Sequence, residues 1–220
     1  MTKQKRSIPK QIELVFDVLY LITAILIGGY LLFTSKGNFA RMLWGIMSLT
    51  LAFGDSFHLV PRILAAATGN ETYFWNAMGI GKMLTSITMT FFYGLLWHCG
   101  LLLFSENLMI LTVVIWILAI MRITLCLLPQ NKWTGRPPSY KWGIYRNIPF
   151  VIMGIMVLLF FAVCGGSQLP QLRFIWLAIL LSFAFYIPVV LGANKNPKLG
   201  MLMLPKTLAY VWIICMGLGL

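Results

Sequence analysis

The chain has 220 residues, of which 60% are hydrophobic and only 10% charged, and its formal net charge is +12 at pH 7. This composition excludes an ordinary soluble domain and is typical of a polytopic membrane protein. The positive charge does not indicate nucleic-acid binding, because the Lys and Arg residues are scattered between apolar runs and form no basic helix or sheet. We therefore expect an all-α protein with a single transmembrane helical domain over residues 1–220.

Seven apolar runs are each long enough to cross the hydrocarbon core of a bilayer as a helix. The basic tail, residues 1–10, leads directly into the first run without a small-residue cleavage site, so we expect no cleavable signal peptide. The aromatic residues at 73–75 are predicted to form an interfacial loop before the third span. The predicted spans cover residues 11–33, 42–67, 77–103, 108–128, 148–164, 174–191 and 204–220.

The Lys and Arg residues between the spans lie mainly on one side of the predicted membrane. Eleven fall on the side of the N-terminus, in the tail 1–10, in the loop 129–147 and over 195–206, against three on the other side: Lys36, Arg41 and Arg173. By the positive-inside rule, the tail and the loop 129–147 are cytoplasmic and the C-terminus is outside. The sequence thus predicts a multi-pass protein of the cell membrane.

The second span carries an acid, a histidine and an arginine inside its apolar run. Asp55, His58, Arg62 and Ser48 fall within about 80° of one another on a helical wheel. Ionisable groups are costly in hydrocarbon and usually serve an ion path, a proton relay or chemistry there. This stripe must face protein or water, and we expect Asp55 and His58 to be the catalytic acid and base if the protein is an enzyme.

The third span has a polar face of its own, which carries Lys82, Ser86, Thr90, Tyr93 and Trp97 within about 80°. His98 lies near the opposite side, so we expect it to have an interfacial or packing role. A buried lysine is tolerable when an acid lies beside it. The sequence therefore predicts an ion pair between Asp55 and Lys82.

Together these faces predict an intramembrane pocket that opens towards the cytoplasm or the inner leaflet, at the depth of a phosphate headgroup. Such a pocket requires a cavity of about 300 Å³ or more. The alternative is a purely structural network of ion pairs and snorkelling side chains, which would leave no space. The predicted ligand-binding residues are Arg62, Lys82, Tyr93 and Arg122.

Two further groups of residues suggest no site of their own. The two histidines and four cysteines show no metal-ligand spacing, so we expect no metal, no other cofactor and no disulfide. On the first span, Glu13, Asp17 and Tyr20 form a short polar stripe near the N-terminal end.

The run Gly54-Asp55-Ser56-Phe57-His58-Leu59-Val60-Pro61, followed in the next span by the Phe- and Gly-rich stretch at 89–94, resembles the YhhN family of lysoplasmalogenases. The resemblance implies a multi-span hydrolase that cleaves the vinyl ether bond of lysoplasmalogens with intramembrane aspartates. Asp55 would then be a catalytic acid or base. The family's second aspartate has no counterpart here, since no Asp or Glu follows Glu106, and His58 would have to supply the second proton-transfer group.

Two classes of function follow from these observations. The first is a hydrolase of lysolipids in the inner leaflet, with Asp55 and His58 as the catalytic pair. The second is a non-enzymatic binder or carrier of an anionic small molecule or lipid headgroup, which would use the same cationic pocket. Membrane lipid is the expected partner in both, and nucleic acid in neither.

Overall fold

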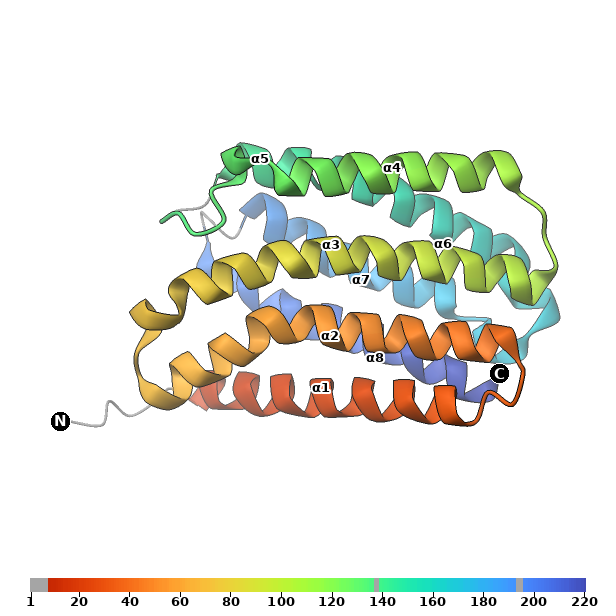
Figure 1. Ribbon diagram of the computed structural model, residues 1–220, viewed down its shortest axis with the longest axis horizontal. Helices are drawn as coiled ribbons and strands as arrows, with labels where there is room; N and C mark the ends of the chain where they lie inside the picture. The colour runs from red at the N-terminus through yellow and green to blue at the C-terminus, as the bar shows by residue number, and fades with distance from the viewer. Residues whose placement is uncertain (1–7, 137–138, 193–195) are drawn as a thin grey trace.

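The chain folds into a bundle of long helices that run side by side (Figure 1). The computed structural model describes residues 8–136, 139–192 and 196–220, and no β-strand occurs within them. The helices are α1 (Ile8–Phe33), α2 (Phe39–Thr68), α3 (Glu71–Phe104), α4 (Met109–Leu127), α5 (Tyr140–Tyr145), α6 (Ile148–Gln168), α7 (Ile175–Gly192) and α8 (Met203–Met216). Short 3-10 turns occupy Pro129–Asn131, Pro170–Leu172, Pro197–Leu202 and Gly217–Gly219.

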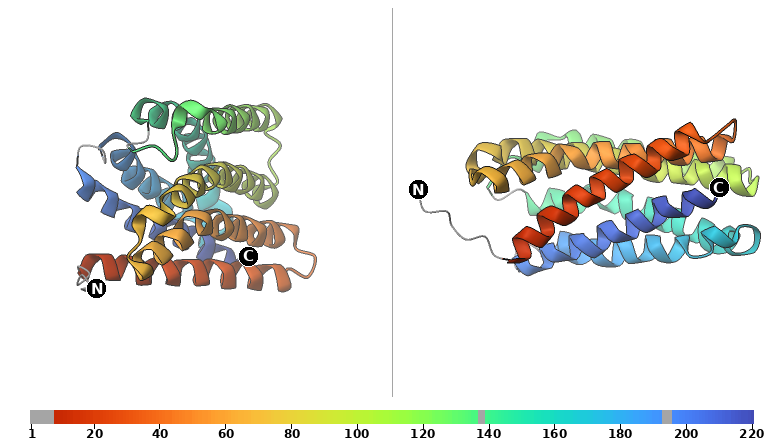
Figure 2. Two further views of the ribbon diagram at one scale, coloured as in Figure 1. Left: turned by 60° about the vertical axis from the view of Figure 1, so that its left-hand side comes forward. Right: turned by 90° about the horizontal axis from the view of Figure 1, so that it is seen from below.

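Within the described residues, seven helical segments are long and apolar enough to cross a membrane, which confirms the predicted seven-span, all-α architecture. α2, α3 and α4 form one layer, α6, α7 and α8 form the other, and α1 crosses obliquely at their edge (Figure 2). Each long helix packs on the next one along the chain, and α8 packs back on α1, so the seven close into a ring. α3 also contacts α6 across the ring.

The two ends of the bundle differ in the connections that they carry. At one end α2, α4 and α7 finish, α3, α6 and α8 begin, and the short helix α5 lies beside the end of α4 and the start of α6 (Figure 1). We call this the α5 end. α1 also begins there, whereas the C-terminus lies at the opposite end. Of the predicted tail, residues 1–7 lie outside the described part of the chain and residues 8–10 already belong to α1.

The predicted aromatic loop at 73–75 is wrong, because these residues form the first turn of α3. Gly69 ends α2 with a φ of +75°, and its N–H donates to the carbonyl of Ala65. Asn70 then caps α3, since its side-chain oxygen accepts a 3.2 Å hydrogen bond from the N–H of Tyr73. A left-handed C-cap followed directly by an N-cap completes the connection in two residues.

The predicted loop 129–147 is folded onto the end of α4, apart from residues 137–138, which lie outside the described part of the chain. The last carbonyl groups of a helix have no partners within it. Here the side chain of Asn131 donates to the carbonyl of Leu125 at 2.6 Å, and the indole of Trp133 donates to that of Cys126 at 2.9 Å. Arg146 donates to Asn131 Oδ1 at 2.9 Å and covers the Trp133 ring at 4.0 Å. This segment therefore forms a wall at the α5 end.

Candidate functional site

A cavity of about 570 Å³ lies inside the bundle at the α5 end. All seven long helices and α5 contribute to its wall. Its charged lining consists of three carboxylates and five cations: Glu13, Asp17, Asp55, Arg62, Lys82, Arg122, Arg146 and Lys206. The cavity thus has a formal excess of two positive charges.

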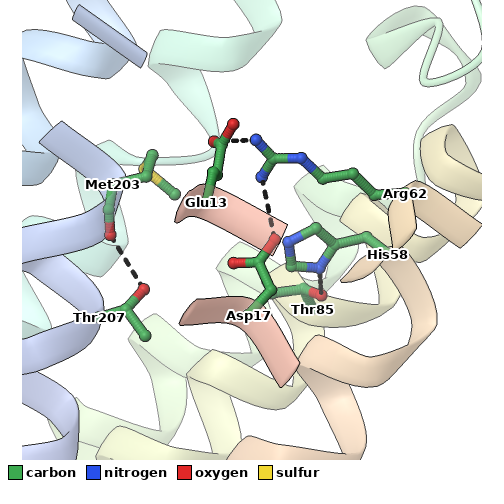
Figure 3. A network of polar contacts seen from close by, with 7 residues as sticks. All are labelled: Glu13, Asp17, His58, Arg62, Thr85, Met203 and Thr207. Atoms are coloured by element: carbon green, nitrogen blue, oxygen red, sulfur yellow. Dashed lines mark hydrogen bonds and ion pairs between the residues drawn. The ribbon is translucent and has the colours of Figure 1, made fainter. Parts of the chain in front are cut away.

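Arg62 on α2 is held by two carboxylates of α1 (Figure 3). Its Nη2 forms an ion pair with Glu13 Oε1, and its Nη1 lies 3.7 Å from Asp17 Oδ2. The side chain of Asp17 is only 7% exposed, whereas that of Arg62 is 37% exposed. Arg62, predicted as a ligand-binding residue, therefore joins α2 to α1 and already has its anionic partners.

Asp55 lies near the middle of α2 and accepts a 2.6 Å hydrogen bond from the hydroxyl of Tyr20 on α1. The predicted ion pair with Lys82 is wrong, since the ion pairs among the described cavity residues are those of Arg62. The reason is the axial register of α2 and α3. Gly81 packs against the backbone of Phe57 and His58, so Lys82 lies nearer the α5 end than Asp55 does.

The hydrogen bonds of His58 fix the proton on one ring nitrogen. Thr85 Oγ1 donates its only proton to the carbonyl of Gly54 at 2.8 Å. The 2.8 Å bond between Thr85 Oγ1 and His58 Nδ1 must therefore be donated by Nδ1. In the neutral imidazole, Nε2 then carries the lone pair. Because His58 lines the cavity and its Nε2 is turned away from Thr85 (Figure 3), this nitrogen can accept a proton from a group bound there.

Four cationic side chains of the cavity have no ion pair with an acid among the described residues: Lys82, Arg122, Arg146 and Lys206. Arg122 is 2% exposed, its guanidinium carbon lies 3.4 Å from the centre of the Phe150 ring, and its Nε and Nη1 have no hydrogen-bond partner in the described chain. Lys206 is 9% exposed, with Nζ at 4.9 Å from the ring of Tyr186 and 5.0 Å from that of Tyr210. Aromatic faces attract a cation but leave its charge uncompensated.

Tyr93 does not line the cavity, although the sequence predicts it as a ligand-binding residue. It is fully buried, and its hydroxyl lies 3.3 Å from Ser182 Oγ. Aromatic rings surround it on several helices: Phe92, Phe150, Phe183 and Tyr210. The polar face of α3 is thus divided by depth, with its first residues, Lys82 and Ser86, on the cavity and its later ones in the packed core.

His98 lies apart from the cavity and accepts a 3.1 Å hydrogen bond at Nε2 from the indole of Trp116 on α4. Ser48, on the predicted stripe of α2, is buried and donates to the carbonyl of Trp44 at 2.9 Å. Ser48 is therefore bonded within α2, whereas His98 joins α3 to α4, in agreement with the packing role predicted for it.

Two cations of the cavity, Arg146 and Lys206, were not predicted to belong to it, because their positions place them with the loop residues of the cytoplasmic side. The sequence does indicate that Lys206 lies within a span, since residues 199–205 before it are Leu, Met, Gly or Pro and place it inside an apolar run. No such pattern surrounds Arg146, which is brought to the cavity because it directly follows α5. Glu13 and Asp17 form a recognisable stripe, but only the contacts of α1 with both α2 and α8 bring them to the cavity.

No group of three His, Cys, Asp or Glu side chains in the described part of the chain is placed to hold a metal ion. Comparison with known proteins finds no match among family models, curated proteins or solved structures. What this protein does must therefore be inferred from the chemistry of the cavity.

Proposed function

We propose that this chain is a multi-pass protein of the cell membrane that binds an anionic small molecule or lipid headgroup in the cavity at the α5 end. The observation that carries the proposal is the set of cavity cations without acidic partners among the described residues, Lys82, Arg122, Arg146 and Lys206, of which Arg122 and Lys206 are buried. A buried cation without a counter-charge is costly, and a bound anion offsets that cost. Glu13 and Asp17 are paired with Arg62, and Asp55 accepts a hydrogen bond from Tyr20 and lies beyond ion-pair distance of these four cations.

An oxyanion such as phosphate or carboxylate fits this set of donors. Arg122 has buried N–H groups without partners on two of its nitrogens, and guanidinium groups form strong charge-assisted hydrogen bonds with oxyanions. Lys206 adds a second positive charge on the same cavity. A volume of about 570 Å³ lies in the range of small-molecule sites.

Replacing Arg122 or Lys206 by Gln is expected to weaken the binding of inorganic phosphate and of glycerol 3-phosphate by about tenfold to a hundredfold, since a charge-assisted hydrogen bond contributes about 1.5–3 kcal/mol. The measurement is calorimetric titration of the purified protein in detergent. Lys198→Gln is the matched control, because Lys198 is an exposed cation outside the cavity lining. Equal losses in all three variants would indicate nonspecific attraction, and no binding by the wild type would refute the proposal.

We further propose that the α5 end is cytoplasmic, because residues 1–10, the loop 129–147 and the stretch 195–206 together carry eleven Lys and Arg residues, against three at the opposite end. A cysteine introduced at Asn107 is then expected to react with a membrane-impermeant maleimide on intact cells. One introduced at Gln130 is expected to react only after permeabilisation. Both positions are exposed and lie at opposite ends of the bundle, and the native cysteines are replaced by Ala in each variant. The reverse pattern would place the cavity in the outer leaflet.

The second candidate function is hydrolysis of lysolipids, of the kind that the YhhN resemblance implies. It is favoured by the unprotonated Nε2 of His58, which can act as a general base beside Asp55. The test is incubation of the purified protein with lysophospholipids and lysoplasmalogens, with His58→Gln as the comparison. Product formed by the wild type but not by this variant would establish the hydrolase, whereas intact lipid in both would leave binding as the function.

A further inference from the structure

A second, apolar hollow of about 280 Å³ lies between α6 and α7. Its walls include Ile148 and Ile152 on α6 and Ile187 and Leu191 on α7, each of which is exposed by 37% to 51%. These side chains face outward from the bundle, towards the surface that hydrocarbon covers in a spanning helix. We call this hollow the α6–α7 groove.

The groove exists because α6 and α7 separate towards the α5 end. Deeper in the bundle the two helices touch, and a Cβ added at Gly154 would overlap the ring of Phe183. Nearer the α5 end the residues of the groove leave a space between the same two helices. The groove is thus a hollow in the outer face of the ring at the level of the charged cavity.

The groove and the cavity adjoin, because Asn147, Tyr186 and Val190 line both. At their junction the hydroxyl of Tyr186 donates to Asn147 Oδ1 at 2.8 Å, and Lys206 Nζ lies 4.9 Å from the centre of the Tyr186 ring. Polarity therefore rises in steps from isoleucine and leucine side chains, through an amide and a phenol, to buried cations. This order matches the order of groups along an anionic lipid, from acyl chain through ester to headgroup.

We infer that the ligand is an anionic lipid whose phosphate lies in the charged cavity and whose acyl chain leaves between α6 and α7 along the α6–α7 groove. The inference rests on the proposed anion site and adds the class of ligand and its path from the bilayer. A small anion from solution would make no contact with the apolar groove, whereas a lipid needs an apolar surface for its acyl chain. The groove supplies that surface next to the residues that it shares with the cavity.

The inference is tested with two probes on the full-length protein in detergent: glycerol 3-phosphate, and its oleoyl ester, which adds one acyl chain to the same headgroup. Ile152→Trp fills the groove, and Ile187→Trp fills it from the opposite wall. Each methylene excluded from an apolar site loses about fourfold in affinity, so each variant is expected to bind the oleoyl ester about tenfold more weakly. Binding of glycerol 3-phosphate is expected to stay unchanged.

Ile155→Trp is the matched control, because Ile155 is 50% exposed on the same helix but does not line the groove. It is expected to change neither affinity. If the wild type binds both probes equally, or if Ile152→Trp and Ile187→Trp leave the ester's affinity unaltered, the groove holds no acyl chain and the cavity binds a free anion. If the wild type binds neither probe, the proposed anion site itself is refuted.

Discussion

Gly81→Ala is expected to destabilise the protein by about 3 kcal/mol, because α2 and α3 approach too closely there for any side chain. A Cβ at Gly81 would overlap the carbonyl oxygen of Phe57 and lie 2.7 Å from the Cα of His58. These are backbone atoms, so no flexible side chain can move aside. The helices would have to separate along the interface that holds His58 to Thr85.

The measurement is thermal unfolding in detergent, with Gly29→Ala as the matched control. Gly29 also lies within a long helix, but a Cβ there would have no atom within 4 Å. Alanine favours a helix over glycine by about 0.5–1 kcal/mol, so the control is expected to be neutral or slightly stabilising. Similar melting temperatures for the two variants would mean that α2 and α3 are not packed as closely as the structure shows.

The seven spans were predictable because a membrane imposes length and hydropathy on any helix that crosses it. What the hydropathy pattern misses are short, local features. The first turn of α3 is aromatic and resembles an interfacial loop, yet the Gly69 and Asn70 caps leave no residues for one. Likewise, α6 continues through 165–168, beyond the predicted span 148–164, because the glycines at 165 and 166 are tolerated in membrane helices.

For the site, the helical wheel identified the correct face of α2, since Asp55, His58 and Arg62 all line the cavity. It did not identify their partners. A wheel gives the direction of a side chain but neither its depth nor the neighbouring helix. Asp55 bonds to Tyr20 because α1 packs directly on α2, at a depth and on a face that the wheel of α2 alone does not give.

The same limit explains the different outcomes for Lys82 and Tyr93, which share a face of α3. Lys82 lies near the α5 end, where the helices separate around the cavity, and Tyr93 lies three turns deeper, where the ring is filled by aromatic side chains. A tyrosine can lie either on a polar cavity or in a packed core, because it combines an apolar ring with a hydroxyl that needs one partner. The position of Tyr93 on the polar face of α3 therefore did not show whether it lies on the cavity or in the core.

Arg62→Met is expected to destabilise the protein by about 3 kcal/mol, because it leaves Glu13 and the buried Asp17 without their cation. Removing one partner of a buried pair costs about 3–5 kcal/mol, and the partial exposure of Arg62 places this case at the lower end. Arg173→Met, which removes a cation near the opposite end of the bundle, is the control and is expected to have little effect.

The network is tested further by the triple variant Glu13→Gln, Asp17→Asn, Arg62→Met, measured by thermal unfolding and by phosphate titration. Replacing a whole buried ion network is often nearly neutral, so the triple variant is expected to recover most of the stability that Arg62→Met loses. Its phosphate affinity is expected to remain near that of the wild type, because Arg62 is already occupied by carboxylates. A loss of affinity as large as that of Arg122→Gln would show instead that Arg62 leaves its acids to bind the anion.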